Sequence, residues 1–435
     1  MRKILLIFLL VIPAIAMGQT AIGLEEALAL ARAGNLQLQQ QQLSQRIAEL
    51  QVAVSNGQRL PTANLGTLSF WLGDISSLSL PSPVPGISTP EIKLGGNNIT
   101  ALNLFLSQPI YAGGRLRNQV KLSQTAREVE QARQDLVGQQ VAYQVYRLMY
   151  QAQILKKEHG SKDASLRRLQ VELANSKNLL RAAQSTAFDT LRFHNQGLQI
   201  KLERERLAKD EKLLSLQLAH LLDLEAPRAI AEIQFADPSP PSEPLDDLLA
   251  EAWQNRPELQ VIRLRVQTAE LKRRLAKGAY WPSISAQVGY VVVRPELEFS
   301  NDEWWNFPVA GLNLQWNLWR GNQDRNRVRQ AEAEQEQLTL EEQELLSAVA
   351  LEVKTSMENL DFAYQQIGLA RELLAQQQES YRIATLQREQ GLATTSEVIE
   401  VETALTTAEL QMQRAVIGYY VAKAELLLAT GRIDQ

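Results

Sequence analysis

Two carboxylates near the C-terminal end of the chain, Glu397 and Glu400, have the spacing that points most directly to a chemical role. They follow Gly391, which interrupts a long helical pattern. Residues three apart share one helix face, so this pair would present two negative charges in one direction. A second interpretation stays open for Glu397, because Thr394-x-x-Glu397 is also a capping-box pattern and the helix dipole favours a carboxylate in the first turn.

No other group of residues suggests catalysis. The three histidines, His159, His194 and His220, are isolated, and the chain has no cysteine. The sequence therefore offers neither a thiolate nucleophile nor paired metal ligands, and it contains no phosphate-cradling glycine loop. The formal net charge of −4 gives no basic footprint for nucleic acid. We expect a protein that is not an enzyme, with no cofactor, no bound metal and no nucleic-acid partner.

Residues 1–18 have the pattern of a secretory signal peptide. Arg2 and Lys3 precede an apolar run from Ile4 to Ile15, and small residues follow it. The run is shorter than the ~20 residues that a membrane-spanning helix needs. We therefore expect an exported protein. No later stretch is apolar enough for a spanning helix, so strands must make any membrane span.

The rest of the chain is a tandem duplication. Leu24–Ala29 matches Leu245–Ala250 in pattern, and Gly113 matches Gly321 in a second block. Matching residues at a fixed offset are the signature of an internal repeat. We expect a first structural repeat at residues 19–222, a linker at 223–244 and a second repeat at 245–435.

Proline placement predicts where long helices lie. No proline occurs between Pro109 and Pro227 or after Pro308, and proline inside a helix costs about 3 kcal/mol or more. Both gaps are rich in strong helix formers, with apolar residues three and four apart. We predict helical hairpins at 115–222 and 321–430. The first arm, Arg115 to Arg181, would be roughly 100 Å long at 1.5 Å per residue, which implies a rod or tube.

Two segments in each half alternate with a period of two residues, near 62–110 and 282–319. In Ala310–Trp319, for example, Leu312 and Leu314 oppose Gly311 and Asn313. Such segments of ~10 residues are typical of outer-membrane barrel strands, although a half-buried strand of a soluble sheet alternates in the same way. Four tryptophans bracket the predicted fourth strand, either as an interfacial girdle or as core residues: Trp304, Trp305, Trp316 and Trp319.

The number of strands has a consequence if they cross a membrane. Two strands per half give four per chain, and an open sheet edge cannot stand in hydrocarbon. The smallest membrane barrels have about eight strands. Membrane-spanning strands would therefore require several chains in one barrel.

These features together resemble the TolC-like outer-membrane efflux protein family, over essentially the whole mature chain. The resemblance is carried by "LEEALALARAGNLQL" and its copy "LDDLLAEAWQNRPEL", by "RLPTANL" and "YWPSISA", and by "QPIYAGGRLRNQV" and "LWRGNQDRNRV". The segment "GLATTSEVIEVETALTTAE" looks like the final tip of the family and its returning helix. The order and spacing of these pieces are more specific than any one of them.

The resemblance implies a mainly α fold with a β membrane portion. Three chains would form one 12-stranded outer-membrane barrel that continues into a periplasmic helical barrel, with residues 223–244 in an equatorial region. The implied function is a passive conduit of a tripartite efflux or type I secretion system, working with a periplasmic adaptor protein and an inner-membrane transporter. Two alternatives are a metal-ion efflux conduit of the same family and a periplasmic coiled-coil scaffold or adaptor without a pore.

The resemblance also places the functional sites at the two hairpin tips, which align with Gln184 opposite Gly391. The family closes its periplasmic mouth with acidic rings, at positions that correspond to Glu397 and Glu400, where the family usually has aspartate. Ala393 stands where well-studied members carry a latch arginine, so this latch is in doubt. The residues expected to contact an adaptor are Gln184, Ser185, Thr186, Asp189, Gly391, Leu392, Ala393 and Thr394.

Overall fold

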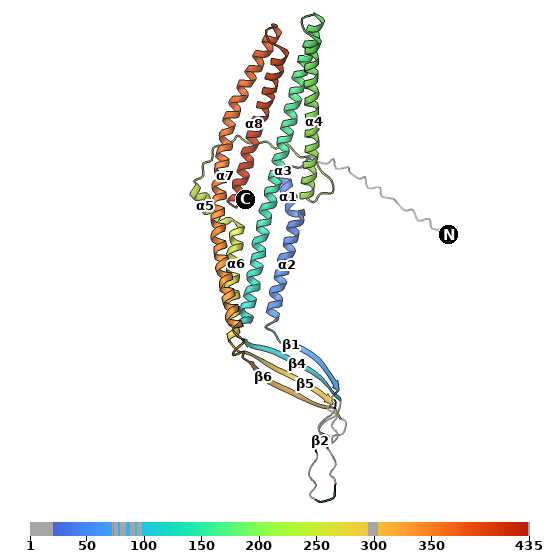
Figure 1. Cartoon of the computed structure of the whole chain (residues 1–435), viewed down its shortest axis with the longest axis vertical. Coiled ribbons are helices and arrows are strands. Elements are labelled where there is room, and N and C mark those ends of the chain that lie inside the picture. The colour runs from blue at the N-terminus through green and yellow to red at the C-terminus, as the bar shows by residue number, and fades with distance from the viewer. Residues whose placement is uncertain are drawn as a thin grey trace, which may run out of the picture. The chain divides into compact units, whose positions relative to one another are not determined.

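A computed structural model describes residues 21–71, 73, 77–78, 84–87, 92–93, 98–294 and 303–433. The predicted signal peptide lies outside these residues. Figure 1 shows the main elements in chain order. The first half contains α1 (Leu24–Gly34), α2 (Leu36–Gly57), β1 (Thr62–Trp71), β4 (Asn98–Ala112), α3 (Arg115–Arg181) and α4 (Ala187–Leu221). The second half contains α5 (Leu245–Asn255), α6 (Pro257–Lys277), β5 (Ser283–Arg294), β6 (Trp305–Gln315), α7 (Gln323–Glu389) and α8 (Thr395–Ala429).

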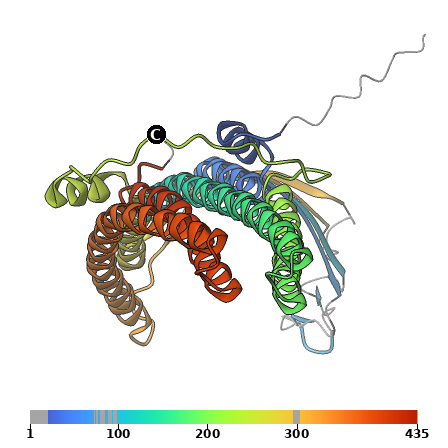
Figure 2. The ribbon, with the colours of Figure 1, turned by 90° about the horizontal axis from the view of Figure 1, so that it is seen from above.

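The long helices confirm the prediction from proline placement. Helix α3 has 67 residues with the predicted bounds, and α7 also has 67. The returning helices α4 and α8 have 35 residues each. In Figure 2, α3 lies beside α4 in green, and α7 lies beside α8 in orange and red. Equal lengths at equivalent places in the two halves are what a duplicated sequence should produce.

The chain divides into two compact units, and each takes segments from both halves. One unit, here called the tip unit, comprises Met1–Gln42, Gln134–Pro257 and Leu345–Gln435. The other, the sheet unit, comprises Leu43–Arg133 and Glu258–Glu344. The long helices pass through both units, so the compact units cut across the sequence repeats.

The sheet unit contains an antiparallel sheet with strand order β1-β4-β5-β6. Leu65 is opposite Leu104, Leu104 is opposite Tyr290, and Tyr290 is opposite Pro308. The central pair, β4 and β5, joins a strand of the first half to a strand of the second. Both faces and both outer strands are largely exposed, since every residue of β1 and ten of eleven in β6 are exposed.

One predicted strand was wrong in its bounds. The fourth strand was predicted at Ala310–Trp319, but β6 starts at Trp305 and ends at Gln315. Pro308 lies inside β6, opposite Tyr290 of β5. Between β1 and β4 the described residues also contain a short antiparallel pair, β2 (Ser77–Leu78) with β3 (Ile92–Lys93).

The tryptophans around β6 are not core residues of this chain. Trp305 begins β6, and Trp316 and Trp319 follow its end. All of them and Trp304 are between 45% and 81% exposed. Their positions at the two ends of a strand agree with the interfacial interpretation rather than with core packing.

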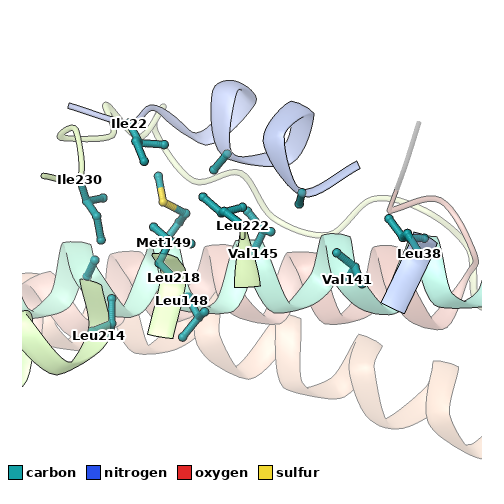
Figure 3. Packing of buried hydrophobic residues seen from close by; sticks show 13 residues of the cluster. Ile22, Leu38, Val141, Val145, Leu148, Met149, Leu214, Leu218, Leu222 and Ile230 are labelled. Atoms are coloured by element: carbon teal, nitrogen blue, oxygen red, sulfur yellow. The ribbon is translucent and has the colours of Figure 1, made fainter. Parts of the chain in front are cut away.

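The tip unit has a hydrophobic core where α1, α2, α3 and α4 meet (Figure 3). Ile22 forms an isolated parallel bridge with Ile230 of the linker, and both side chains are buried in this cluster. Apolar residues of α3 at three- and four-residue spacing face them, as the helical periodicity predicts. The buried members are Ile22, Ala27, Ala31, Leu38, Val141, Val145, Leu148, Met149, Ala152, Leu214, Leu218, Leu222 and Ile230.

The linker between the halves lies against the long helices through hydrogen bonds to its backbone. The Tyr419 hydroxyl donates to the Ser239 carbonyl at 2.8 Å, and the Tyr420 hydroxyl donates to the Ala236 carbonyl at 2.8 Å. The side-chain amide of Gln153 donates to the Ala231 carbonyl at 2.9 Å. These contacts satisfy backbone groups that have no partner in a helix or sheet. In the part of the chain that the structure describes, no helix is long and apolar enough to cross a membrane.

Candidate functional site

The first tip is the short turn between α3 and α4. Ala183 has a φ of 58°, in the left-handed region, and the backbone N–H of Gln184 donates to the Leu179 carbonyl at 2.8 Å. Many helices end in this way, with one residue in the left-handed conformation and the next N–H bonded to the carbonyl five residues earlier. Gln184 and Thr186 are exposed, and Ser185 is half-buried.

The second tip, between α7 and α8, repeats this geometry. Gly391 has a φ of 74°, and the Leu392 N–H donates to the Gln387 carbonyl at 2.8 Å. The residue equivalent to Gly391 is therefore Ala183, and the predicted alignment of Gln184 with Gly391 was wrong by one position. Leu392 is 74% exposed, whereas Ala393 is buried at 7%.

Both tips continue into a capping box. In the first, the Thr186 hydroxyl accepts from the Asp189 N–H at 3.2 Å, and the Thr186 N–H donates to the Asp189 carboxylate at 3.1 Å. The Thr186 hydroxyl also donates to this carboxylate at 2.7 Å. This side-chain donor is the main reason why the pKa of Asp189 falls to about 2. Asp189 therefore carries a negative charge at neutral pH.

In the second tip, Glu397 makes the equivalent contacts. The Thr394 N–H donates to Glu397 Oε2 at 2.6 Å, and the Thr394 hydroxyl accepts from the Glu397 N–H at 3.3 Å. The backbone donor on Thr394 is the main cause of a lowered pKa for Glu397. The capping interpretation of Glu397 is thus realised in the structure. Glu400 lies one turn further along and is exposed, with no hydrogen bond or ion pair to another described residue.

The two tips also touch each other, through α4 and α8. Arg192 of α4 donates a hydrogen bond to the Ser396 hydroxyl in the first turn of α8. The guanidinium carbon of Arg192 also lies 4.6 Å from the centre of the Phe188 ring, within cation–π range. Arg192 therefore connects the first tip to the residue directly before Glu397.

A buried polar cluster further along the hairpins was missed by sequence reasoning. Arg168 of α3 bonds Glu402 and Glu409 of α8, with N–O distances of 3.1 Å to each, and donates to the Thr406 hydroxyl at 2.8 Å. Its guanidinium carbon also lies 5.9 Å from the centre of the Tyr381 ring of α7. We call Arg168, Tyr381, Glu402, Thr406 and Glu409 the interhairpin cluster. Glu402, Thr406 and Glu409 follow one another at i, i+4 and i+7, a spacing that places them on one face of α8 and was visible in the sequence.

The interhairpin cluster contains a buried carboxylate and a tyrosine whose pKa is raised. Glu402 is 1% exposed, and its Oε2 atom has no hydrogen-bond partner in the described chain. Burial is the main reason why the pKa of Tyr381 rises to about 12, with further increases from the charges of Glu172 and Glu402. Burial also raises the pKa of Glu172. Among the described residues, no group of three or more His, Cys, Asp or Glu side chains is arranged to hold a metal ion.

The family model described as outer membrane efflux protein matches residues 248–432. No curated protein matches the sequence.

Three solved structures illustrate the fold, each covering 94% of this chain. They are the outer membrane protein VceC from Vibrio cholerae (14% identity, 96% of that chain, TM-score 0.75), CusC (16%, 92%, 0.79) and the open state of the MtrE outer membrane channel from Neisseria gonorrhoeae (16%, 88%, 0.73). At these identities the structures show the fold, and they confirm the predicted class of long helices with four strands per chain.

Proposed function

We propose that this chain is the outer-membrane channel of a tripartite efflux or type I secretion system, because residues 248–432 match the model of the outer membrane efflux protein family. It would be a passive conduit from the periplasm to the outside. The family whose model matches is one of outer-membrane channel proteins rather than enzymes, which supports a location in the outer membrane with the long helices extending into the periplasm. A periplasmic adaptor and an inner-membrane transporter would complete the pathway.

The sheet is the observation that carries this proposal. It has two open edges, because β1 pairs only with β4 and β6 only with β5 among the described strands. Unpaired backbone groups cost several kcal/mol each in hydrocarbon, so other copies must complete the sheet within a membrane. In an alternating antiparallel order, β6 of one copy can join β1 of the next. Three copies would then close a barrel of twelve strands, and we propose a homotrimer.

The helices of the tip unit support the same assembly. Leu202 on α4 and Leu369 on α7 are 64% and 71% exposed. An open groove of 400 Å³ lies between α7 and α8, lined in part by Leu369, Leu373 and Arg414. Apolar surface of this kind marks an interaction site. In a trimer, helices of the neighbouring chain would cover it.

The periplasmic mouth in this proposal lies at the two tips. Glu397 and Glu400 would form two carboxylate rings around a threefold axis, and such rings favour cations. Capping by Glu397 does not exclude this role, since its charge remains exposed at the end of the helix. The adaptor would contact the turn residues that project from the tips, chiefly Gln184, Ser185, Gly391 and Leu392.

The test is single-channel conductance of the purified mature protein in planar bilayers. The substitution pair Glu397→Gln and Glu400→Gln should change conductance and lower cation preference, while glutamine keeps the capping geometry. A matched pair on the exposed surface of α7, Glu358→Gln with Glu372→Gln, should leave both unchanged. If neither wild type nor the Glu397/Glu400 variant conducts, the channel proposal is wrong. If both conduct with equal cation preference, only the gate assignment fails.

A further inference from the structure

The end of the sheet that adjoins the helices is strongly basic. Figure 1 shows α2, α3, α6 and α7 meeting the strands there. The segments at this junction, residues 51–61, 112–121, 270–282 and 316–329, contain twelve Arg or Lys and two acidic residues. The segments that connect the strands at their other end, 71–98 and 294–304, contain two basic and six acidic residues. In the sequence, basic residues are thus concentrated in the segments on the helix side of the sheet, where Lys272 and Lys277 pair with Glu334 and Glu332.

The two acidic residues at the junction are already paired. Glu270 accepts from Arg273 and Arg274 on its own helix, and Asp324 is bonded by Arg320 at 2.6 Å. Three arginines from three different segments are exposed and form no ion pair with another described residue: Arg59, Arg117 and Arg325. We call these three the basic belt. Their guanidinium groups have no internal counter-ion, so they are available to an external anion.

Aromatic side chains lie beside one member of the basic belt, Arg325. Trp281 is 62% exposed and Trp319 is 81% exposed. A hollow of 220 Å³ is lined by Tyr280, Trp316, Trp319 and Arg325 among others. The indole N–H of Trp316 donates to the Tyr280 carbonyl at 3.1 Å, which fixes one wall of this hollow. The pocket therefore combines a rigid aromatic wall with an unpaired guanidinium.

These two features identify one class of ligand. A guanidinium fork matches the oxygens of a phosphate group, and tryptophan and tyrosine prefer the depth of the lipid headgroups. A free anion would need the arginines but not the aromatic wall, and the formal net charge of −4 disfavours nucleic acid. A phospholipid places a phosphate and a glycerol backbone together at this depth.

We propose that the junction binds the headgroups of anionic phospholipid in the periplasm-facing leaflet, through Arg59, Arg117 and Arg325 and the aromatic hollow beside Arg325. This inference rests on the proposed function, because it requires the sheet to lie in the outer membrane. It adds a lipid-binding site that is defined by its positive charge. Contacts between the basic belt and the headgroups would hold the sheet at a fixed depth in the membrane.

The experiment measures bound lipid by native mass spectrometry on the full mature oligomer in detergent, at low salt. Wild type should retain phosphatidylglycerol in preference to phosphatidylcholine. Each basic residue near an anionic surface contributes about fivefold in affinity, so the triple variant Arg59→Gln, Arg117→Gln, Arg325→Gln should bind phosphatidylglycerol on the order of 100-fold more weakly. The matched control is Arg167→Gln, Arg206→Gln, Arg371→Gln, which removes three exposed charges in the tip unit and should bind as wild type does.

The outcomes separate the alternatives. If the control variant loses as much binding as the triple variant, the effect is one of general charge and the headgroup site is wrong. If an equal concentration of inorganic phosphate displaces the lipid, the site binds free anions rather than headgroups. If the triple variant fails to assemble, Arg325→Gln alone should still weaken binding about fivefold. Conductance decides the parent proposal independently. Channels that conduct while the triple variant keeps its lipid would refute only the lipid site, and lipid loss in a protein that never conducts would refute only the channel.

Discussion

Arg168 of α3 and Glu402 of α8 form a salt bridge of 3.1 Å in which the carboxylate is 1% exposed and the guanidinium side chain 19% exposed. The two residues belong to different helical hairpins. Their pairing therefore ties the hairpin of the first half to that of the second, at a depth where neither charge can be solvated by water alone.

Removing one partner of this pair should be costly. Arg168→Ala leaves Glu402 as an uncompensated buried charge, so we expect a loss of about 3 kcal/mol in the stability of the tip unit. Arg167→Ala, at the exposed neighbouring position, should cost less than about 0.5 kcal/mol. The free energies of unfolding of the two variants are compared by urea denaturation, monitored by probes in the tip unit. Replacing both partners, Arg168→Met with Glu402→Met, should recover most of the lost stability. Equal losses of stability in Arg168→Ala and Arg167→Ala would show that the pair does not stabilise the fold.

The interhairpin cluster also predicts a dependence on alkaline pH. Burial of the phenol is the main reason why the pKa of Tyr381 rises from its ordinary value of 10.0 to about 12. The folded state thus holds this proton more tightly than the unfolded state. Its stabilising contribution is complete below pH ~10 and is lost as the pH rises through ~12. Tyr381→Phe should flatten the stability curve in this window. Tyr364→Phe, on the same helix, serves as the control, and an unchanged slope in Tyr381→Phe would contradict the assignment.

The two tips differ at their left-handed residue, which gives a matched pair of substitutions. An alanine at positive φ costs roughly 1 kcal/mol relative to glycine. Ala183→Gly should therefore stabilise the first tip, and Gly391→Ala should destabilise the second by a similar amount. Amide hydrogen exchange at Gln184 and Leu392, whose N–H groups close the two turns, reports each effect locally. Faster exchange in Ala183→Gly would argue against strain at that position.

The cap of α8 can be tested apart from any gate. Thr394→Ala removes the side chain that accepts from the Glu397 N–H and should cost about 1 kcal/mol of local stability. Thr407→Ala, an exposed position inside the same helix, should be neutral or slightly stabilising because alanine is the stronger helix former. Exchange at the Glu397 amide provides the measurement. Protection that survives in Thr394→Ala would mean that the cap contributes nothing.

The centre of the sheet depends on a glycine. A Cβ on Gly289 of β5 would collide with the Phe105 ring of β4, whereas one on Gly311 of β6 would meet nothing within 4 Å. Gly289→Ala should therefore prevent or slow formation of the proposed trimer, and Gly311→Ala should not. Migration of unheated samples in gel electrophoresis distinguishes them. Normal assembly of Gly289→Ala would show that β4 and β5 can separate enough to admit a methyl group.

Local patterns predicted the helices well and long-range contacts poorly. The bounds of α3 followed from proline placement, because a proline-free run of helix formers has few alternatives. The alignment of the tips was wrong by one residue, because Ala183 resembles an ordinary helix residue until its backbone angle is known. The interhairpin cluster was missed because Arg168 and Glu402 are distant in sequence and no local pattern relates them. The bounds of β6 were wrong because the alternation of apolar and polar residues continues past Gln315, where the strand ends.

The strand order also sets the order of folding events. Leu104 on β4 is opposite Tyr290 on β5, and the entire hairpin of α3 and α4 lies between them in the chain. Helical turns form from neighbouring residues, but this central pair must close a loop of nearly two hundred residues, and such closure slows folding. The first helical hairpin and the β1–β4 pair can thus form from the first half of the chain alone. The β4–β5 pair needs both halves, so the four-stranded sheet is completed only after long-range closure.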